Sequence, residues 1–325
     1  MRKSNNELHI VCSTDKNFVM QTGIMLKSLF VNNSAQKFFI HVIVDDTVSE
    51  DLKRKLRKIV IAEYGNSITF YNADAIDFDG YLNLGSHTHV SKATYYRLFM
   101  AEFLPKDIAK VLYLDGDMVV MNSILDLWNV DISDCAIAGV AEHEIDVIQN
   151  YNRLQYSREL GMFNAGVLLI NLDYWRKYNL QQKFIDFTRE HPERVKWHDQ
   201  DVLNFVLREK KKSLPLKYNV QPGFFYKREF MGMSWERYGE EIETARKKPV
   251  ILHFSTYSKP WYANCSHPMT KVFLKYKNMT EWKDIPLQVK YKPNRKLRYI
   301  CGDILRLLRL RKPVIEESSS FFETN

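Results

Sequence analysis

The segment VLYLDGDMVV (residues 111–120) is an apolar run interrupted by two aspartates and a glycine. Apolar residues precede Asp115, and more of them follow Asp117, so the pattern predicts a buried strand that ends at two carboxylates. Two carboxylates held together at such an end repel each other, and a divalent cation removes that repulsion. Mg²⁺ or Mn²⁺ suits a pair of oxygen ligands, because these ions complete their shell with water and phosphate oxygens.

Two other interpretations of the same residues remain open at this point. Asp-Gly is frequent in hairpin turns, so the segment is also compatible with two paired strands. The pattern is further similar to the nucleophile strand of haloacid-dehalogenase-like phosphatases, in which Asp115 would be phosphorylated and Asp117 would act as acid and base. That motif normally ends the first strand of its domain, whereas here it follows the fourth predicted strand.

Outward from this segment, strands and helices alternate. Periodicity predicts strands at 8–13, 38–44 and 67–73, before the strand that ends at Asp115. It predicts helices between them, at 18–30, 49–63 and 91–104. This alternation predicts an α/β fold with a parallel sheet and helices on both faces. Ligands of such sheets bind at the carboxyl ends of the strands, where Asp115 and Asp117 are expected to lie.

The chain contains two further Asp-x-Asp pairs. Asp77 and Asp79 lie in the polar loop DAIDFDGY, which predicts solvated turn carboxylates. Asp199 and Asp201 begin the predicted helix WHDQDVLNFVL (197–207). One of these two can cap the helix, which leaves the other and Gln200 without a structural explanation.

Composition limits the class of protein. With 325 residues, 45% hydrophobic and 26% charged, the chain can form one main α/β domain with appendages. The sequence has no G-x-G-x-x-G or G-x-x-x-x-G-K-[ST] motif, which argues against a dinucleotide-binding Rossmann enzyme and a P-loop NTPase. No signal peptide or long apolar span is found, so residence on the cytoplasmic side is expected. The dispersed Cys12, Cys135, Cys265 and Cys301 predict buried, reduced thiols rather than a zinc or disulfide framework.

The net charge of +8 is concentrated near the carboxyl terminus. Residues 283–312 hold ten basic and two acidic residues, which accounts for the whole excess. A neutral body with a basic tail predicts contact with an anionic surface rather than with nucleic acid. NRKLRYICGDILRLLRLRKP (294–313) has apolar residues near helical spacing, which is typical of an amphipathic helix on an anionic bilayer. A helix that packs on the body with a solvated basic face explains the same pattern.

Five segments in this order resemble glycosyltransferase family 8, the retaining nucleotide-sugar transferases that include bacterial lipopolysaccharide galactosyl- and glucosyltransferases and glycogenin. They are IVCSTDKNF (10–18), Tyr96-Arg97-Leu98, LYLDGDMVV (112–120), FNAGVLLINL (163–172) with HDQDVLN (198–204), and HFSTYSKPW (253–261). The resemblance covers roughly residues 8–265. It implies a GT-A fold with a mixed, mostly parallel sheet, a bound Mn²⁺ or Mg²⁺, and a UDP-sugar donor.

The resemblance also implies roles for individual residues. Asp115, Asp117 and His253 would bind the metal, and Lys259 would hold the diphosphate. The predicted donor site further includes Ser13, Asp15, Asn17 and Phe18 at the uridine, Arg97, Asn164, Asp199 and Gln200 at the sugar, and Gly116 and Thr256. Asp199 and Gln200 are the candidate catalytic residues, and Glu142 is a candidate for holding an acceptor or sugar hydroxyl.

Two of these positions carry a further expectation. Gly116 would keep the space between the aspartates free for the nucleotide. Thr256 stands where the family pattern H-x-x-G-x-x-K has a glycine, which lets a backbone approach a phosphate closely.

The resemblance implies transfer of glucose or galactose from a UDP-hexose to a saccharide or lipid-linked glycan acceptor, as in lipopolysaccharide or another cell-surface glycan. We predict a transferase domain over 1–280 and a basic amphipathic tail over 281–325. The tail would attach the protein peripherally to the inner face of the cytoplasmic membrane, and no nucleic acid partner is expected.

Overall fold

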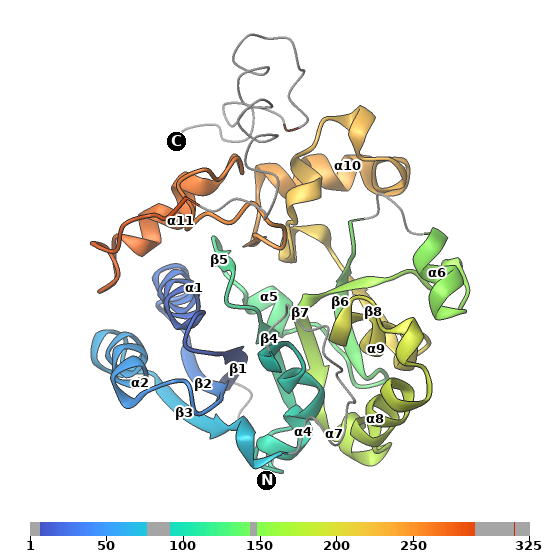
Figure 1. Ribbon diagram of the computed structural model, residues 1–325, viewed down its shortest axis with the longest axis horizontal. Coiled ribbons are helices and arrows are strands. Elements are labelled where there is room, and N and C mark those ends of the chain that lie inside the picture. Colours follow the sequence, from blue (N-terminus) through green and yellow to red (C-terminus); the bar gives the residue numbers. More distant parts are fainter. Residues whose placement is uncertain (1–6, 77–91, 144–147, 290–314, 316–325) are drawn as a thin grey trace.

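A seven-stranded sheet with the order β3-β2-β1-β4-β7-β6-β8 forms the centre of the computed structural model (Figure 1). The structure describes residues 7–76, 92–143, 148–289 and 315. The Asp77–Asp79 loop, Cys301 and the predicted tail helix 294–313 lie outside these residues. The strands are β1 Glu7–Thr14, β2 Lys37–Val44, β3 Ser67–Asn72, β4 Lys110–Leu114, β6 Ile137–Ala141, β7 Phe163–Asn171 and β8 Lys211–Leu214, with β5 Met118–Val120 and β9 Ile251–His253 in a second sheet.

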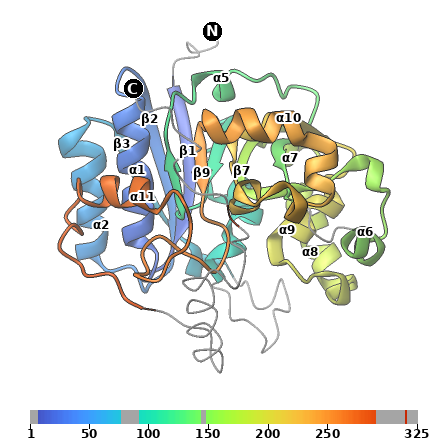
Figure 2. The same ribbon diagram turned by 90° about the horizontal axis from the view of Figure 1, so that it is seen from above.

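Helices cover both faces of the large sheet. Figure 2 shows α1 and α2 beside β1–β3, and α6, α8 and α9 at the other end of the molecule. The described α-helices are α1 Val19–Asn32, α2 Glu50–Arg57, α4 Met100–Phe103, α5 Leu125–Trp128, α6 Ile148–Leu154, α7 Leu172–Lys177, α8 Leu180–Glu190, α9 His198–Val206, α10 Met233–Lys247 and α11 Thr270–Lys277. In the described part of the chain, no helix is both long and apolar enough to cross a membrane.

The predicted α/β fold with a mixed, mostly parallel sheet is confirmed. Strands β3, β2, β1 and β4 run parallel, β7 is antiparallel to both β4 and β6, and β8 is parallel to β6. Successive side chains of the central strands enter opposite cores: Leu112 and Leu114 face one, and Val111 and Tyr113 face the other. Burial on both faces explains why these strands are continuous apolar runs.

One predicted helix, 91–104, is wrong as a continuous element. The described part, from residue 92 on, forms the short 3₁₀ turns Lys92–Thr94 and Tyr96–Phe99 and then α4. The Arg97 side chain donates from Nε to the Thr94 carbonyl at 3.1 Å, and so takes an acceptor that a regular helix would give to a backbone N–H. This break in the helix lets the buried Arg97 side chain point into the interior of the protein.

The thiols are only partly as expected. Cys12 and Cys135 are buried and Cys265 is half-buried, and all three are free.

Candidate active site

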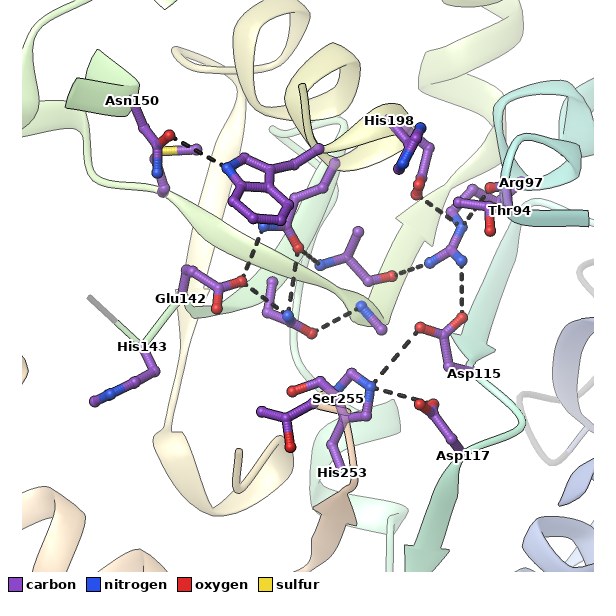
Figure 3. Close-up of a pocket in the computed structure, with 18 residues that line it drawn as sticks. Thr94, Arg97, Asp115, Asp117, Glu142, His143, Asn150, His198, His253 and Ser255 are labelled. Carbon is purple, nitrogen blue, oxygen red and sulfur yellow. Dashed lines mark hydrogen bonds and ion pairs between the residues drawn. The ribbon is translucent and has the colours of Figure 1, made fainter. Parts of the chain in front are cut away.

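The predicted metal and sugar residues gather around a pocket of about 570 Å³ (Figure 3). Strand direction brings them together. Strand β4 ends at Leu114, and the antiparallel β7 begins at the same edge, so that the Asp115 N–H donates to the Gly166 carbonyl at 3.0 Å. The lining residues are Thr94, Arg97, Asp115, Asp117, Glu142, His143, Asn150, Met162, Asn164, Ala165, Gly166, Trp197, His198, Asp199, Gln200, His253, Ser255 and Thr256.

Asp115, Asp117 and His253 form a compact set of possible metal ligands. One ligand atom from each lies within 4.8 Å of the others. His253 Nε2 is 3.2 Å from Asp117 Oδ1 and 3.9 Å from Asp115 Oδ2 (Figure 3). Two carboxylates and an imidazole on a largely buried wall fit a divalent ion such as Mn²⁺.

The hairpin interpretation of the Asp-Gly-Asp segment is wrong. Strand β4 belongs to the large sheet, whereas β5 leaves it and pairs with β9 in the second sheet. The pairing sets Met118 opposite His253, and the Phe254 N–H donates to the Asp117 carbonyl at 2.9 Å. The segment therefore joins two sheets, and it meets His253 because of this second pairing.

Lys259 contacts the same group. Its Nζ lies 2.5 Å from Asp117 Oδ2 and also donates to the Phe254 carbonyl. Burial acts to raise the pKa of Asp117, but the charges of Lys259 and His253 outweigh it and lower that pKa. Asp117 is therefore ionised, as a metal ligand requires.

Arg97 lies between two acidic residues. Its Nη2 donates to Asp115 Oδ1 at 2.8 Å, and its Nε lies 2.9 Å from Asp199 Oδ2 while the Nε hydrogen points to the Thr94 carbonyl. Asp115 thus accepts a well-aligned hydrogen bond from Arg97, whereas Asp199 lies close to the guanidinium without accepting an aligned hydrogen bond. Burial raises the pKa of Asp199 to about 7, against the effect of Arg97 and assisted by the charge of Asp115.

Gln200 lies in a network of hydrogen bonds on the opposite wall. Its Oε1 accepts from the Ala165 N–H at 3.0 Å and from Asn164 Nδ2 at 3.3 Å. Its Nε2 donates to Glu142 Oε2 at 2.9 Å, and Asn164 Nδ2 donates to the same oxygen at 2.8 Å (Figure 3). The predicted residues Glu142, Asn164 and Gln200 therefore lie together, with the Gln200 amide held in one orientation.

Asp201 has a structural role. Its fully buried carboxylate forms two contacts with Arg153, at 2.7 and 3.0 Å, and accepts from the backbone N–H groups of Lys196 and Trp197. It thereby joins α6 to the segment before α9. His198, at the start of α9, has a left-handed φ of 54°, which directs Asp199 and Gln200 to the pocket.

Four predicted uridine residues lie at the end of β1, outside the residues that line this pocket. The Ser13 hydroxyl donates to the Ala93 carbonyl at 2.9 Å and lies 2.8 Å from the Tyr113 hydroxyl. Asp15 Oδ1 accepts from the N–H groups of Asn17 and Phe18, at 2.8 and 3.2 Å, just before α1. The Phe18 ring, 36% exposed, meets the edge of Trp261.

Gly116 also has a packing role. A Cβ at this position would lie 2.7 Å from Thr22 Oγ1 and 3.4 Å from the Thr22 backbone nitrogen. The glycine therefore allows the loop to pack against α1, a contact that nothing in the local sequence indicated.

Two residues at the site were not predicted from the sequence: Trp197, which lines the pocket, and Tyr113, which contacts the lining residues Arg97 and Asp115. Tyr113 donates from its hydroxyl to Asp115 Oδ1 at 3.0 Å, and its ring lies under the Arg97 guanidinium. Trp197 is half exposed, and its Nε1 donates to Asn150 Oδ1 at 3.3 Å. Tyr113 lies within an apolar strand, so its place in the sequence does not indicate a functional role. The position of Trp197 next to HDQD does indicate one.

Comparison with known proteins agrees with this geometry. The model of "Glycosyl transferase family 8" matches residues 9–265. General stress protein A of Bacillus subtilis is 28% identical, over 88% of this chain and 98% of its own. Lipopolysaccharide 1,3-galactosyltransferase of Salmonella typhimurium is 28% identical, over 85% of this chain and 80% of its own. The crystal structure of galactosyltransferase LgtC with donor and acceptor sugar analogues has a TM-score of 0.73 at 22% identity, covering 90% of this chain and all of LgtC, which shows a shared fold.

The phosphatase alternative is not supported, since the family match includes the Asp-Gly-Asp segment and His253 together. The chain belongs to glycosyltransferase family 8 and is a glycosyltransferase.

Proposed function

We propose that the protein is a metal-dependent, retaining hexosyltransferase that moves glucose or galactose from a UDP-sugar to a saccharide acceptor. The observation that carries this proposal is the cluster of Asp115, Asp117 and His253 beside a pocket lined by sugar-binding side-chain types. The names of relatives support a hexosyl donor, since they include a lipopolysaccharide 1,3-galactosyltransferase and a lipopolysaccharide 1,2-glucosyltransferase.

The reaction separates a diphosphate anion from a sugar with oxocarbenium character, so both charges need stabilisation. Asp115, Asp117 and His253 would hold Mn²⁺ or Mg²⁺. When bound, the ion supplies Lewis-acid neutralisation of the leaving group. Lys259, next to Asp117, holds the diphosphate from the side of the loop 254–259.

Residues on the opposite wall of the pocket act on the sugar. Asp199 and Arg97 hold sugar hydroxyls, and the Gln200 amide, fixed by Ala165 and Glu142, lies at the developing positive charge. An amide is a poor nucleophile, so retention proceeds by attack from the face that the diphosphate leaves. The acceptor hydroxyl passes its proton to a departing phosphate oxygen as its oxygen bonds to the anomeric carbon.

The remaining donor contacts belong to the same proposal. Ser13, Asp15, Asn17 and Phe18 receive the uridine at the end of β1, and Phe18 contributes a stacking ring. Thr256, a lining residue, approaches the phosphates with its hydroxyl instead of the bare backbone of the family's glycine.

The acceptor is a cell-surface glycan, such as lipopolysaccharide, reached at the inner face of the cytoplasmic membrane. Glu142 binds an acceptor hydroxyl, and the exposed face of Trp197 packs on its ring. The basic residues 290–313 attach the protein to anionic lipid. We propose that the attaching segment begins after Val289 rather than at 281, a choice supported by Trp282, which is 4% exposed, and by the pairing of Tyr262 with Gln288.

A deletion after Val289 tests the membrane attachment. The shortened protein should lose flotation with anionic liposomes while its hydrolysis of the donor remains. Unchanged flotation would remove this part of the proposal.

A screen of UDP-sugars tests the activity itself. With Mn²⁺, UDP-glucose or UDP-galactose should release UDP, and chelation should stop the release. Hydrolysis of p-nitrophenyl phosphate is the control for a phosphatase and should be absent. Failure of every UDP-sugar with Mn²⁺, across saccharide acceptors, would refute the proposed donor class.

A further inference from the structure

A continuous line of hydrogen-bonded side chains connects the buried His253 to the half-buried Gln200 through Asn219 and Asn164. His253 Nδ1 lies 3.0 Å from Asn219 Oδ1, and Asn219 Nδ2 donates to Asn164 Oδ1 at 2.9 Å. Asn164 Nδ2 then reaches Gln200 Oε1 at 3.3 Å. Asn219 is fully buried and His253 is 4% exposed, so these bonds are shielded from water.

A backbone N–H group determines which atom donates in the hydrogen bonds that join Asn164, Asn219 and His253. The Gly166 N–H donates to Asn164 Oδ1 at 3.0 Å, and a backbone N–H cannot accept. The Asn164 oxygen is thereby assigned, so the group that meets it from Asn219 is the Nδ2 donor. The oxygen of Asn219 must then face His253.

This assignment determines the tautomer of His253. Because Asn219 presents an acceptor, the hydrogen of the neutral imidazole resides on Nδ1. The lone pair is left on Nε2, the nitrogen 3.2 Å from Asp117 Oδ1 and 3.9 Å from Asp115 Oδ2. Nε2 is therefore prepared to bind a cation together with the two carboxylates.

The backbone explains why Asn219 reaches this position. The Val220 N–H donates to the Ile251 carbonyl at 2.9 Å, and the His253 N–H donates to the Val220 carbonyl at 3.0 Å. These bonds attach the segment around Asn219 alongside β9. The register between the two segments, rather than any motif, sets the two side chains together.

We propose that Asn219 is a positioning residue, which fixes the tautomer and ring orientation of His253 for metal binding and joins that ligand to the amides that hold Gln200. The metal-binding part of this inference rests on the proposed function. The tautomer part does not, because it concerns the protein without an ion.

The tautomer is tested by ¹⁵N NMR of the histidine side chains in full-length, metal-free protein, with His253→Gln used to assign the signal. His253 should show a protonated Nδ1 in the wild type, whereas Asn219→Ala, which lacks the acceptor, should show a fraction of His253 with an unprotonated Nδ1. A wild-type His253 with an unprotonated Nδ1 would overturn the inference, whatever the activity of the protein.

Metal binding is tested by electron paramagnetic resonance titration with Mn²⁺ alone. Asn219→Ala should weaken Mn²⁺ binding by about ten- to a hundredfold. Asn219→Asp keeps an acceptor for His253 and should restore binding to within a few-fold of the wild type. Asn219→Ser should behave like Asn219→Ala, because the serine hydroxyl is too short to reach both His253 and Asn164. It takes the place of the alanine variant if that variant does not fold.

A matched control separates positioning from lost stability. Asn33 is also a buried asparagine, with three hydrogen bonds to the backbone of Leu29, Asn122 and Ile124. Asn33→Ala should lower the melting temperature but leave Mn²⁺ affinity unchanged. Wild-type Mn²⁺ affinity in folded Asn219→Ala would overturn the inference, whereas a wild-type protein that binds no Mn²⁺ would refute the metal part of the proposed function.

Discussion

Asp117 Oδ2 and Lys259 Nζ lie 2.5 Å apart, although 142 residues separate them in the sequence. The ammonium group sits where a metal ligand and a diphosphate would meet. Lys259→Met should therefore weaken UDP binding in the presence of Mn²⁺ by at least about tenfold, the loss expected for one charge-assisted contact. Mn²⁺ binding without nucleotide should not weaken, because the cation no longer competes with the ammonium. Calorimetric titration measures both, and unchanged UDP affinity would contradict the role of Lys259.

Gly116→Ala should destabilise the protein through its contact with α1. The new Cβ would lie 2.7 Å from Thr22 Oγ1, and overpacking of this kind costs about 1–3 kcal/mol of unfolding free energy. Adding Thr22→Ala removes that oxygen, so the double variant should regain part of the loss in urea denaturation. A double variant no more stable than Gly116→Ala would show that the contact with Thr22 is not the cause.

Gly166→Ala should displace a metal ligand. A Cβ at this position would lie 2.4 Å from His253 Cε1 and 2.7 Å from Met118 Cε, so the imidazole would have to move. We expect Mn²⁺ affinity to fall at least about tenfold, as when the groups that orient a ligand are lost. In Gly239→Ala, in α10, the new Cβ would lie 3.1 Å from the Trp235 ring, away from the metal ligands, and Mn²⁺ affinity should not change. Wild-type affinity in Gly166→Ala would show that the site tolerates the movement.

Arg153→Ala should be strongly destabilising. The carboxylate of Asp201 is fully buried, and removal of Arg153 leaves it without its cationic partner. Breaking a buried pair costs about 3–5 kcal/mol, which equilibrium denaturation with urea would resolve. A loss below about 1 kcal/mol would mean that water replaces the arginine at this site.

Stability should depend on pH through Asp199. Its pKa is raised by burial to about 7 from the ordinary 3.8, so ionisation is harder in the folded than in the unfolded protein. The resulting stabilisation is complete below pH about 4 and is lost as the pH rises through about 7. Asp199→Asn removes this dependence. Its melting temperature relative to the wild type should therefore be higher at pH 8 than at pH 5, and a constant difference would contradict the raised pKa.

The sequence predicted those elements whose cause is local. The strand at 38–44 is a nearly unbroken apolar run, and β2 spans Lys37–Val44. Ser49 begins the helix predicted over 49–63, and its hydroxyl accepts from the Leu52 N–H at the start of α2. The helix predicted at 91–104 failed because Arg97 bonds to the Thr94 carbonyl while reaching Asp115, a partner 18 residues away.

The candidate site divides in the same way. The residues proposed as metal ligands could be selected from the sequence because their types stand in a recognisable order along the chain, and the structure brings them together. Asn219 and Gly166 were missed because strand pairing brings each of them to its neighbour in space, and Tyr113 was missed because Arg97 reaches its ring from a separate 3₁₀ turn. The packing of Gly116 against Thr22 depends on where α1 lies and could not be predicted from the sequence.

The most direct test is UDP binding by the wild type and by Asp117→Asn, measured calorimetrically with Mn²⁺ and with a chelator. Wild-type protein should bind UDP with Mn²⁺ and lose at least about tenfold in affinity when the metal is removed, because the ion bridges the diphosphate and the carboxylates. Asp117→Asn should bind weakly under both conditions. Equal UDP affinity of the wild type with and without metal, or an Asp117→Asn variant with full metal dependence, would contradict a metal-dependent nucleotide-sugar site at Asp115, Asp117 and His253.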